Sequence, residues 1–203
     1  KRIAFLNKYS LIFHFLLACL LILAVETISR RDFVSAITFI SNHTLAFLYN
    51  ALIIFASLSL VYLTKYRTQM RILISGLWIF LGTVNGLILS NRVTPFSYTD
   101  LKCLPDLFAM QNTNYFTAEE ATMVVSVVVA FFVILGLLFA KGPRYQGKRH
   151  TVLGPVSIAA LILIGLPITT QAAQSSNILA SYFANIAQGY SDYGFVYGFS
   201  TSV

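Results

Sequence analysis

Five stretches of this sequence are each long and apolar enough to cross a lipid bilayer, and this feature restricts the fold more than any other. A hydrocarbon core of about 30 Å requires roughly 20 predominantly apolar residues in helical form. Such helices satisfy their backbone hydrogen bonds internally, and the stretches lack the alternating pattern of barrel strands. The sequence therefore predicts an all-α, polytopic membrane protein with five transmembrane helices, at residues 9–25, 45–63, 72–89, 121–140 and 152–168.

Charged residues are scarce, as expected for a chain that lies mostly in lipid. They make up 10% of the sequence, against 57% hydrophobic residues, whereas a soluble domain carries roughly 25% charged residues. This composition leaves no room for a large soluble catalytic domain within the 203 residues. The net charge of +7 does not indicate nucleic-acid binding, because in a membrane protein the distribution of charge matters more than its sum.

The basic residues are divided unequally between the two sides of the predicted bundle. Ten of the fourteen lie in the N-terminal arm and in the second-to-third and fourth-to-fifth connections, and no acidic residue lies with them. Arg30, Arg31, Arg92 and Lys102 share the other side with all seven acidic residues. Because Lys and Arg accumulate in cytoplasmic loops, we expect the N-terminus in the cytoplasm and the C-terminus outside the cell. The basic run at 141–150 reflects this orientation or contact with anionic lipid.

Three further segments lie on the predicted outer side. Residues 30–44 have apolar positions at helical spacing and suit a short helix in the membrane interface. Residues 90–120 form the longest loop. Residues 169–203 contain one predicted helical face, formed by Ile178, Leu179, Tyr182, Phe183 and Ile186, and then a glycine and aromatic run. We expect a five-helix transmembrane domain at 1–168 and an extracellular juxtamembrane linker at 169–203.

No motif for a metal site or a catalytic nucleophile is present in the sequence. The three histidines, His14, His43 and His150, are too dispersed for a local ligand spacing. Cys19 lies within the first predicted span and Cys103 in an outer loop, so a disulfide between them is not expected. We expect no catalytic residue, no metal ligand and no cofactor in this chain.

Several polar residues lie where the predicted helices reach the outer side of the bilayer. Glu26 and Arg30 are four residues apart, in the order that favours an ion pair on a helix. Two interpretations remain open: an interfacial salt bridge, or a cationic rim of Arg30, Arg31 and Arg92 that binds a phosphate headgroup. Asn85, inside the third span, is expected to form a hydrogen bond with a neighbouring helix.

The end of the third span and the loop after it carry a family resemblance. Residues 85–101, with the sequence NGLILSNRVTPFSYTDL, resemble the membrane domain of the lipoteichoic acid synthase family, especially its clostridial-type members. Residues 47–54 and the exit of the first span from Glu26 to Arg30 are similar to the same family, in the same order. The resemblance covers most of the chain.

This resemblance implies five transmembrane helices and an outer linker helix, followed by a large extracellular domain of the sulfatase or alkaline-phosphatase type. In the family, that domain holds a Thr nucleophile and a divalent metal and acts as a phosphoglycerol transferase. It moves glycerol phosphate from phosphatidylglycerol to a growing polymer. Nothing in this sequence matches that domain, so we expect the chain to lack it and to end shortly after the linker.

The expected function is to anchor the catalytic domain in a bacterial cell membrane and to present an anionic phospholipid such as phosphatidylglycerol. The expected partners are membrane phospholipid and the chain's own catalytic domain, with no nucleic acid, and a divalent metal is expected only in that domain. The alternatives are a stand-alone membrane scaffold or sensor and a small lipid transporter or flippase. The residues assigned to the headgroup or to the outer-loop motif are Glu26, Arg30, Asn85, Asn91, Arg92, Thr94, Pro95 and Asp100.

Overall fold

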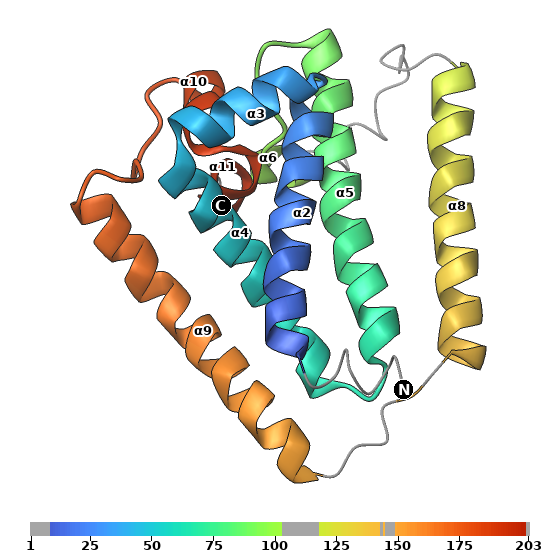
Figure 1. Ribbon diagram of the computed structural model, residues 1–203. Coiled ribbons are helices and arrows are strands. Elements are labelled where there is room, and N and C mark those ends of the chain that lie inside the picture. The colour runs from blue at the N-terminus through green and yellow to red at the C-terminus, as the bar shows by residue number, and fades with distance from the viewer. Residues whose placement is uncertain (1–8, 103–117, 143, 145–148, 202–203) are drawn as a thin grey trace.

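The structure, a computed structural model, describes residues 9–102, 118–142, 144 and 149–201, and every regular element in these ranges is a helix. This confirms the all-α prediction for the described part of the chain (Figure 1). The elements are α2 (Ser10–Arg30), α3 (Phe33–Asn42), α4 (Thr44–Ser59), η1 (Leu60–Leu63), α5 (Arg67–Asn91), α6 (Tyr98–Lys102), α8 (Ala118–Lys141), α9 (Arg149–Ser175), α10 (Ile186–Tyr193) and α11 (Phe195–Thr201).

Four helical stretches in the described part are long and apolar enough to cross a membrane, which fits a helical membrane protein. They are Ser10–Arg30, Thr44–Leu63, Arg67–Ser90 and Val156–Ser175. The remaining predicted span, 121–140, coincides with α8. Its described apolar stretch, Val128–Lys141, is shorter than a span, so a fifth crossing stays a prediction.

Helices α2, α4 and α5 form the centre of the bundle, with α2 packed against both neighbours. Ile22 and Val25 of α2 are fully buried, as is Ile54 of α4. Gly86 allows α5 to approach α2 closely, because a Cβ atom there would lie 2.5 Å from the carbonyl oxygen of Ile28. Small residues at such contacts are typical of helix packing in membranes, where backbones gain dispersion energy by close approach.

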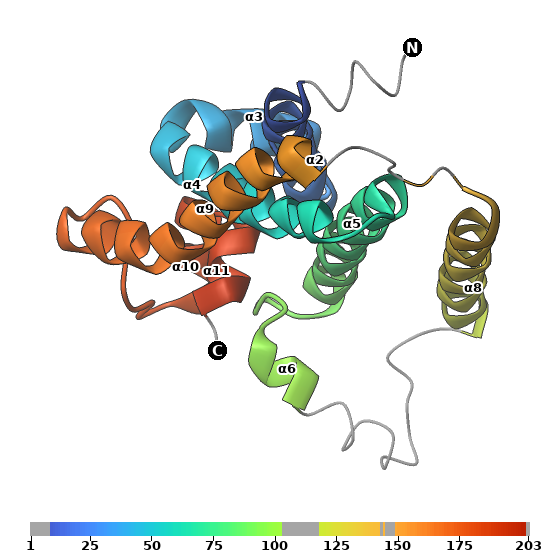
Figure 2. The ribbon, with the colours of Figure 1, turned by 90° about the horizontal axis from the view of Figure 1, so that it is seen from below.

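Helices α8 and α9 lie on opposite sides of this centre, as the two views show (Figures 1 and 2). Phe139 of α8 packs its ring 5.3 Å from the ring of Tyr66, which precedes α5. On the other side, Tyr49 of α4 forms a hydrogen bond with the hydroxyl of Thr170 in α9. These contacts attach both outer helices to the central three.

The predicted short helix between the first two spans is present as α3. Asp32 begins it by accepting hydrogen bonds from the backbone N–H groups of Val34 and Ser35, the usual role of Asp at a helix N-terminus. Ala36 and Phe39 face the bundle and are buried. Its location in the membrane interface stays a prediction.

The C-terminal segment differs from the predicted linker in two ways. Helix α9 continues to Ser175, past the expected boundary at 168, and residues 176–185 form turns instead of a helical face. Asn177 has a positive φ of 56°, which ends the helical path, and Asn185 starts α10 by accepting a hydrogen bond from the N–H of Gln188. Helices α10 and α11 then fold back onto α2 and α4. The segment is therefore part of the bundle (Figure 1).

Candidate functional site

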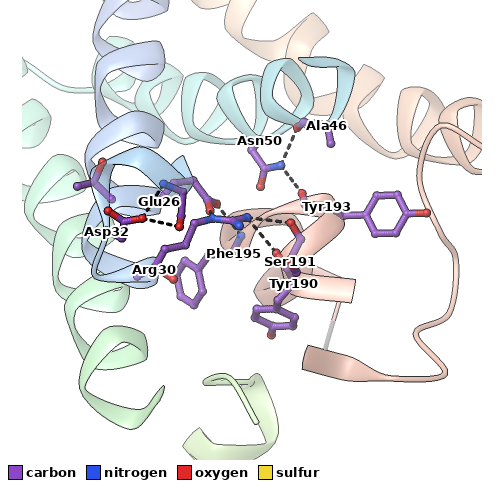
Figure 3. A network of polar contacts seen from close by, with 12 residues as sticks. Glu26, Arg30, Asp32, Ala46, Asn50, Tyr190, Ser191, Tyr193 and Phe195 are labelled. Carbon is purple, nitrogen blue, oxygen red and sulfur yellow. Dashed lines mark hydrogen bonds and ion pairs between the residues drawn. The ribbon is translucent and has the colours of Figure 1, made fainter. Parts of the chain in front are cut away.

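Glu26 lies at the point where the returning C-terminal segment meets α2. Its side chain is 1% exposed and both of its oxygens are bonded. Arg30 donates from Nε to Oε2 at 2.8 Å, which confirms the predicted ion pair, and Phe195 donates its backbone N–H to Oε1 at 2.7 Å (Figure 3). The carboxylate thus joins the last turn of α2 to the first turn of α11.

Arg30 ties α2 to the other C-terminal helix. Its Nη2 donates to the carbonyl oxygens of Ser191, at 2.9 Å, and Tyr190, at 3.5 Å (Figure 3). Both carbonyls belong to the last turn of α10, and the one of Tyr190 also accepts the backbone N–H of Gly194. The C-terminal end of a helix attracts positive charge. The guanidinium carbon also lies 4.5 Å from the centre of the Phe39 ring, so Arg30 is held on three sides.

Asn50 plays a similar part on α4, and it is not among the site residues predicted from the sequence. It is fully buried. Its Nδ2 donates to the carbonyl oxygens of Ala46 and Tyr193, and its Oδ1 accepts the N–H of Tyr197 at 2.6 Å. The available signal was an amide in the middle of an apolar span, since such a group requires a polar partner in lipid.

Asn85 positions the loop that carries the family resemblance. It is 1% exposed, and its Nδ2 donates to the hydroxyl of Ser29 in α2 at 2.6 Å, an interhelical bond of the expected kind. Its Oδ1 accepts the N–H of Phe96 at 2.6 Å. Tyr190 of α10 donates its hydroxyl to the carbonyl of the same Phe96. The loop after α5 is therefore held from both α5 and α10.

The guanidinium of Arg92 bonds to the loop that follows it in the sequence. Its Nε donates to the carbonyl of Thr94 and its Nη2 to the carbonyl of Pro95, and Nη2 also pairs with Asp100 at 2.6 Å. Burial raises the pKa of Asp100, but the hydrogen bonds from Arg92 and Ser97 outweigh this and hold it below its ordinary value. The loop is closed by this ion pair.

Replacing Asp100 with Asn is expected to destabilise the protein slightly at neutral pH and not at all in acid. The folded pKa of Asp100 lies below its unfolded value, so its contribution is complete above about pH 3.8 and is lost as the pH falls through the folded pKa. Both side chains are partly exposed, so the contribution is about 1 kcal/mol or less. Thermal unfolding of wild type and Asp100→Asn across pH tests this. A difference that persists unchanged in acid would assign the effect to loop packing.

A pocket of about 310 Å³ opens between α2, α5 and α10, and we call it the α2–α10 pocket. Of the predicted site residues, four line it: Glu26, Arg30, Asn85 and Pro95. Ser29, Ser35 and Ser191 add hydroxyl groups to its wall. The pocket thus combines one guanidinium, one carboxylate and several neutral hydrogen-bonding groups.

The predicted cationic rim of three arginines is not assembled around this pocket. Arg30 lines it, but Arg31 donates to the hydroxyl of Ser90 at 2.7 Å and Arg92 is taken up by its own loop. Arg31 and Arg92 are not among the residues that line this pocket, and a rim of three arginines elsewhere stays a prediction. The side chain of Asn91, the remaining predicted site residue, lies outside the described part of the structure.

Within the described ranges, no three His, Cys, Asp or Glu side chains are grouped so that they could hold a metal ion. His14 lies near the N-terminal end of α2, and His43 lies between α3 and α4. Cys103 and the side chain of His150 lie outside the described residues. The expectation of a divalent metal in a separate catalytic domain stays a prediction. Comparisons with protein-family models, with curated proteins and with solved structures found no match to this chain.

Proposed function

We propose that this chain is the membrane domain of a phosphoglycerol transferase of the lipoteichoic acid synthase type, and that the α2–α10 pocket binds the headgroup of an anionic phospholipid. The observation that carries the proposal is the position of Arg30 in a polar pocket at one end of a membrane-type bundle. The family named in this proposal comes from the sequence resemblance at residues 85–101. A pocket confined to one end favours presentation of a headgroup over transport across the membrane.

The chemistry of the pocket matches a phosphoglycerol headgroup. Such a headgroup carries one phosphodiester anion and two hydroxyls. Arg30 uses Nε and Nη2 for Glu26 and α10, which leaves Nη1 without a hydrogen-bond partner among the described residues and suited to a phosphate oxygen. Ser29 and Ser35 offer hydroxyls for the glycerol. The volume of about 310 Å³ is at the lower limit of ordinary ligand pockets, which suits a headgroup whose acyl chains remain in the bilayer.

The proposed arrangement in a bacterial cell membrane follows from the charge distribution. The ends of the helices at Ser10, Leu63, Arg67 and Lys141 face the cytoplasm, and the α2–α10 pocket faces outward. Helix α8 supplies the fifth crossing in this arrangement. An extracellular catalytic domain would then take its lipid substrate from the pocket on its own side of the membrane.

Replacing Ala187 with Trp tests the pocket, because Ala187 is a half-buried residue of α10 that lines it. The indole would fill the space without removing any of the bonds that hold Arg30. Ala184→Trp is the matched control, since Ala184 is exposed and lies outside the pocket lining. We expect Ala187→Trp to retain about tenfold less phosphatidylglycerol relative to phosphatidylcholine in native mass spectrometry. Equal retention of phosphatidylglycerol by the two variants would contradict the proposal that the pocket binds the headgroup.

A further inference from the structure

The α2–α10 pocket is assembled from parts of the chain that are far apart in the sequence. Residues of α2, α10 and α11 are among those that line it: Glu26 and Arg30 from α2, Ala187 and Ser191 from α10, and Phe195 from α11. Arg30 and Ser191 are 161 positions apart, and Glu26 and Phe195 are 169 positions apart. The pocket is therefore complete only while α10 and α11 are packed against α2.

The polar groups of the pocket also hold this wall in place. Oε1 of Glu26 accepts the N–H of Phe195 at 2.7 Å, and Nη2 of Arg30 donates to the carbonyl of Ser191 at 2.9 Å (Figure 3). A ligand that fills the pocket contacts α2 on one side and α10 on the other. Such a ligand loses contacts when α10 and α11 are released, so it binds the packed arrangement more tightly than the released one.

Asn50 holds the same two helices from outside the pocket. It is fully buried in α4 and is not among the residues that line the pocket. Its Nδ2 donates to the carbonyl of Tyr193 at 2.7 Å, and its Oδ1 accepts the N–H of Tyr197 at 2.6 Å. These two bonds lie on either side of Gly194, which connects α10 to α11. Asn50 therefore acts on the pocket only through the wall that it positions.

We propose that ligand binding in the α2–α10 pocket is coupled to the docking of α10 and α11 onto α2 and α4, with Asn50 as a positioning residue. The proposal rests on the headgroup function proposed above and describes the regulation of that site. A ligand that prefers the docked arrangement stabilises it, and by linkage any change that releases α10 and α11 weakens the binding of the ligand. An anionic headgroup thus fastens the C-terminal helices, and its departure loosens them.

The experiment measures chymotrypsin cleavage after Tyr193 and Tyr197 in the full chain, held in phosphatidylcholine nanodiscs with and without phosphatidylglycerol. The protease concentration is kept in the range where the cleavage rate is proportional to it, so that the rate follows the population of the released form. A ligand at about 90% occupancy reduces that population about tenfold, so we expect about tenfold slower cleavage with phosphatidylglycerol.

Native mass spectrometry of the same samples separates the coupling from the headgroup function. Retention of phosphatidylglycerol over phosphatidylcholine with unchanged cleavage would overturn the coupling and leave the headgroup function standing. Equal retention of the two lipids would overturn the headgroup function, and the coupling with it.

A charged substitution in the pocket assigns the protection to this site. Ala187→Glu places a carboxylate in the pocket, where it repels a phosphate, and it adds no aromatic residue for chymotrypsin. Ala184→Glu is the matched control, because Ala184 is exposed and lies outside the pocket lining. We expect phosphatidylglycerol to slow cleavage of Ala184→Glu about tenfold and to leave that of Ala187→Glu unchanged. Equal slowing in both variants would overturn the coupling through this pocket.

A substitution outside the pocket tests the positioning role of Asn50. Asn50→Leu keeps a side chain of similar size and removes the bonds to both helices. Ser57→Ala is the matched control, because it removes another interhelical bond of α4, the one that Ser57 accepts from Nε1 of Trp78.

We expect Asn50→Leu to be cleaved about tenfold faster than wild type without phosphatidylglycerol, the effect of losing a buried hydrogen bond, and phosphatidylglycerol to return the rate to that of ligand-free wild type. A merely structural role would lower the thermal unfolding midpoint of Asn50→Leu without this local cleavage. Cleavage of Asn50→Leu no faster than that of Ser57→Ala would overturn the role of Asn50.

Discussion

Replacing Glu26 with Ala is expected to release the C-terminal segment from the bundle and to lower the free energy of unfolding by about 3 kcal/mol. The carboxylate is 1% exposed and accepts bonds from Arg30 and from the N–H of Phe195. Its removal leaves a partly buried guanidinium and a buried N–H without their acceptor. Helices α10 and α11 contain no Lys or Arg but several aromatic residues, so chymotrypsin is the appropriate probe. Faster cleavage after Tyr190, Tyr193 or Tyr197 is the expected result.

Two further substitutions separate the charge of Glu26 from its hydrogen bonds. Glu26→Gln keeps an acceptor for Phe195 and loses only the ion pair, so its effect should fall between wild type and Glu26→Ala. Asp192→Asn is the control, because among the described residues the side chain of Asp192 bonds only to Gln188 on the surface of α10. If Glu26→Ala were cleaved no faster than Asp192→Asn, the carboxylate would not hold the segment.

The central helices could be predicted from the sequence because length and apolar composition are sufficient to specify a membrane helix. The predicted spans at 45–63 and 72–89 lie within the helical stretches Thr44–Leu63 and Arg67–Asn91. The ion pair of Glu26 and Arg30 was also predictable, because both residues lie on one helix and their spacing of four residues is sufficient to bring them together.

The return of the C-terminal segment could not be predicted in this way. It depends on the N–H groups of Phe195 and Tyr197, which reach Glu26 and Asn50 across 169 and 147 positions in the sequence. No local pattern specifies such a pairing, and the aromatic run was equally compatible with an interfacial linker. The bonds of Arg31 to Ser90 and of Arg92 to the carbonyl of Thr94 could not be predicted either, because a count of charges does not reveal neutral oxygen acceptors.

Replacing Gly194 with Ala is expected to be as damaging as the loss of the Glu26 carboxylate. Gly194 connects α10 to α11 with φ 87° and ψ 161°, a backbone conformation that is essentially restricted to glycine. A Cβ atom there would lie 2.9 Å from Oε1 of Glu26 and 2.9 Å from Nδ2 of Asn50. The side chain would therefore strain the backbone and push apart the two groups that hold α11. Strain of about 1–3 kcal/mol and the loss of a buried hydrogen bond of about 1 kcal/mol give a destabilisation of about 3 kcal/mol.

The same substitution at Gly136 is the matched control. Gly136 lies within α8, and beyond the backbone of its own helix a Cβ atom there would meet no described atom within 4 Å. Alanine is favoured over glycine inside a helix by about 1 kcal/mol, so Gly136→Ala should be neutral or slightly stabilising. Thermal unfolding in detergent and chymotrypsin cleavage compare the two variants. If Gly194→Ala behaves like Gly136→Ala in both assays, α11 is not docked through Glu26 and Asn50. If only Gly194→Ala is cleaved rapidly, the turn at Gly194 is required to dock α11. Glu26 would then have two roles, because it lines the α2–α10 pocket and also accepts the N–H of Phe195 in α11.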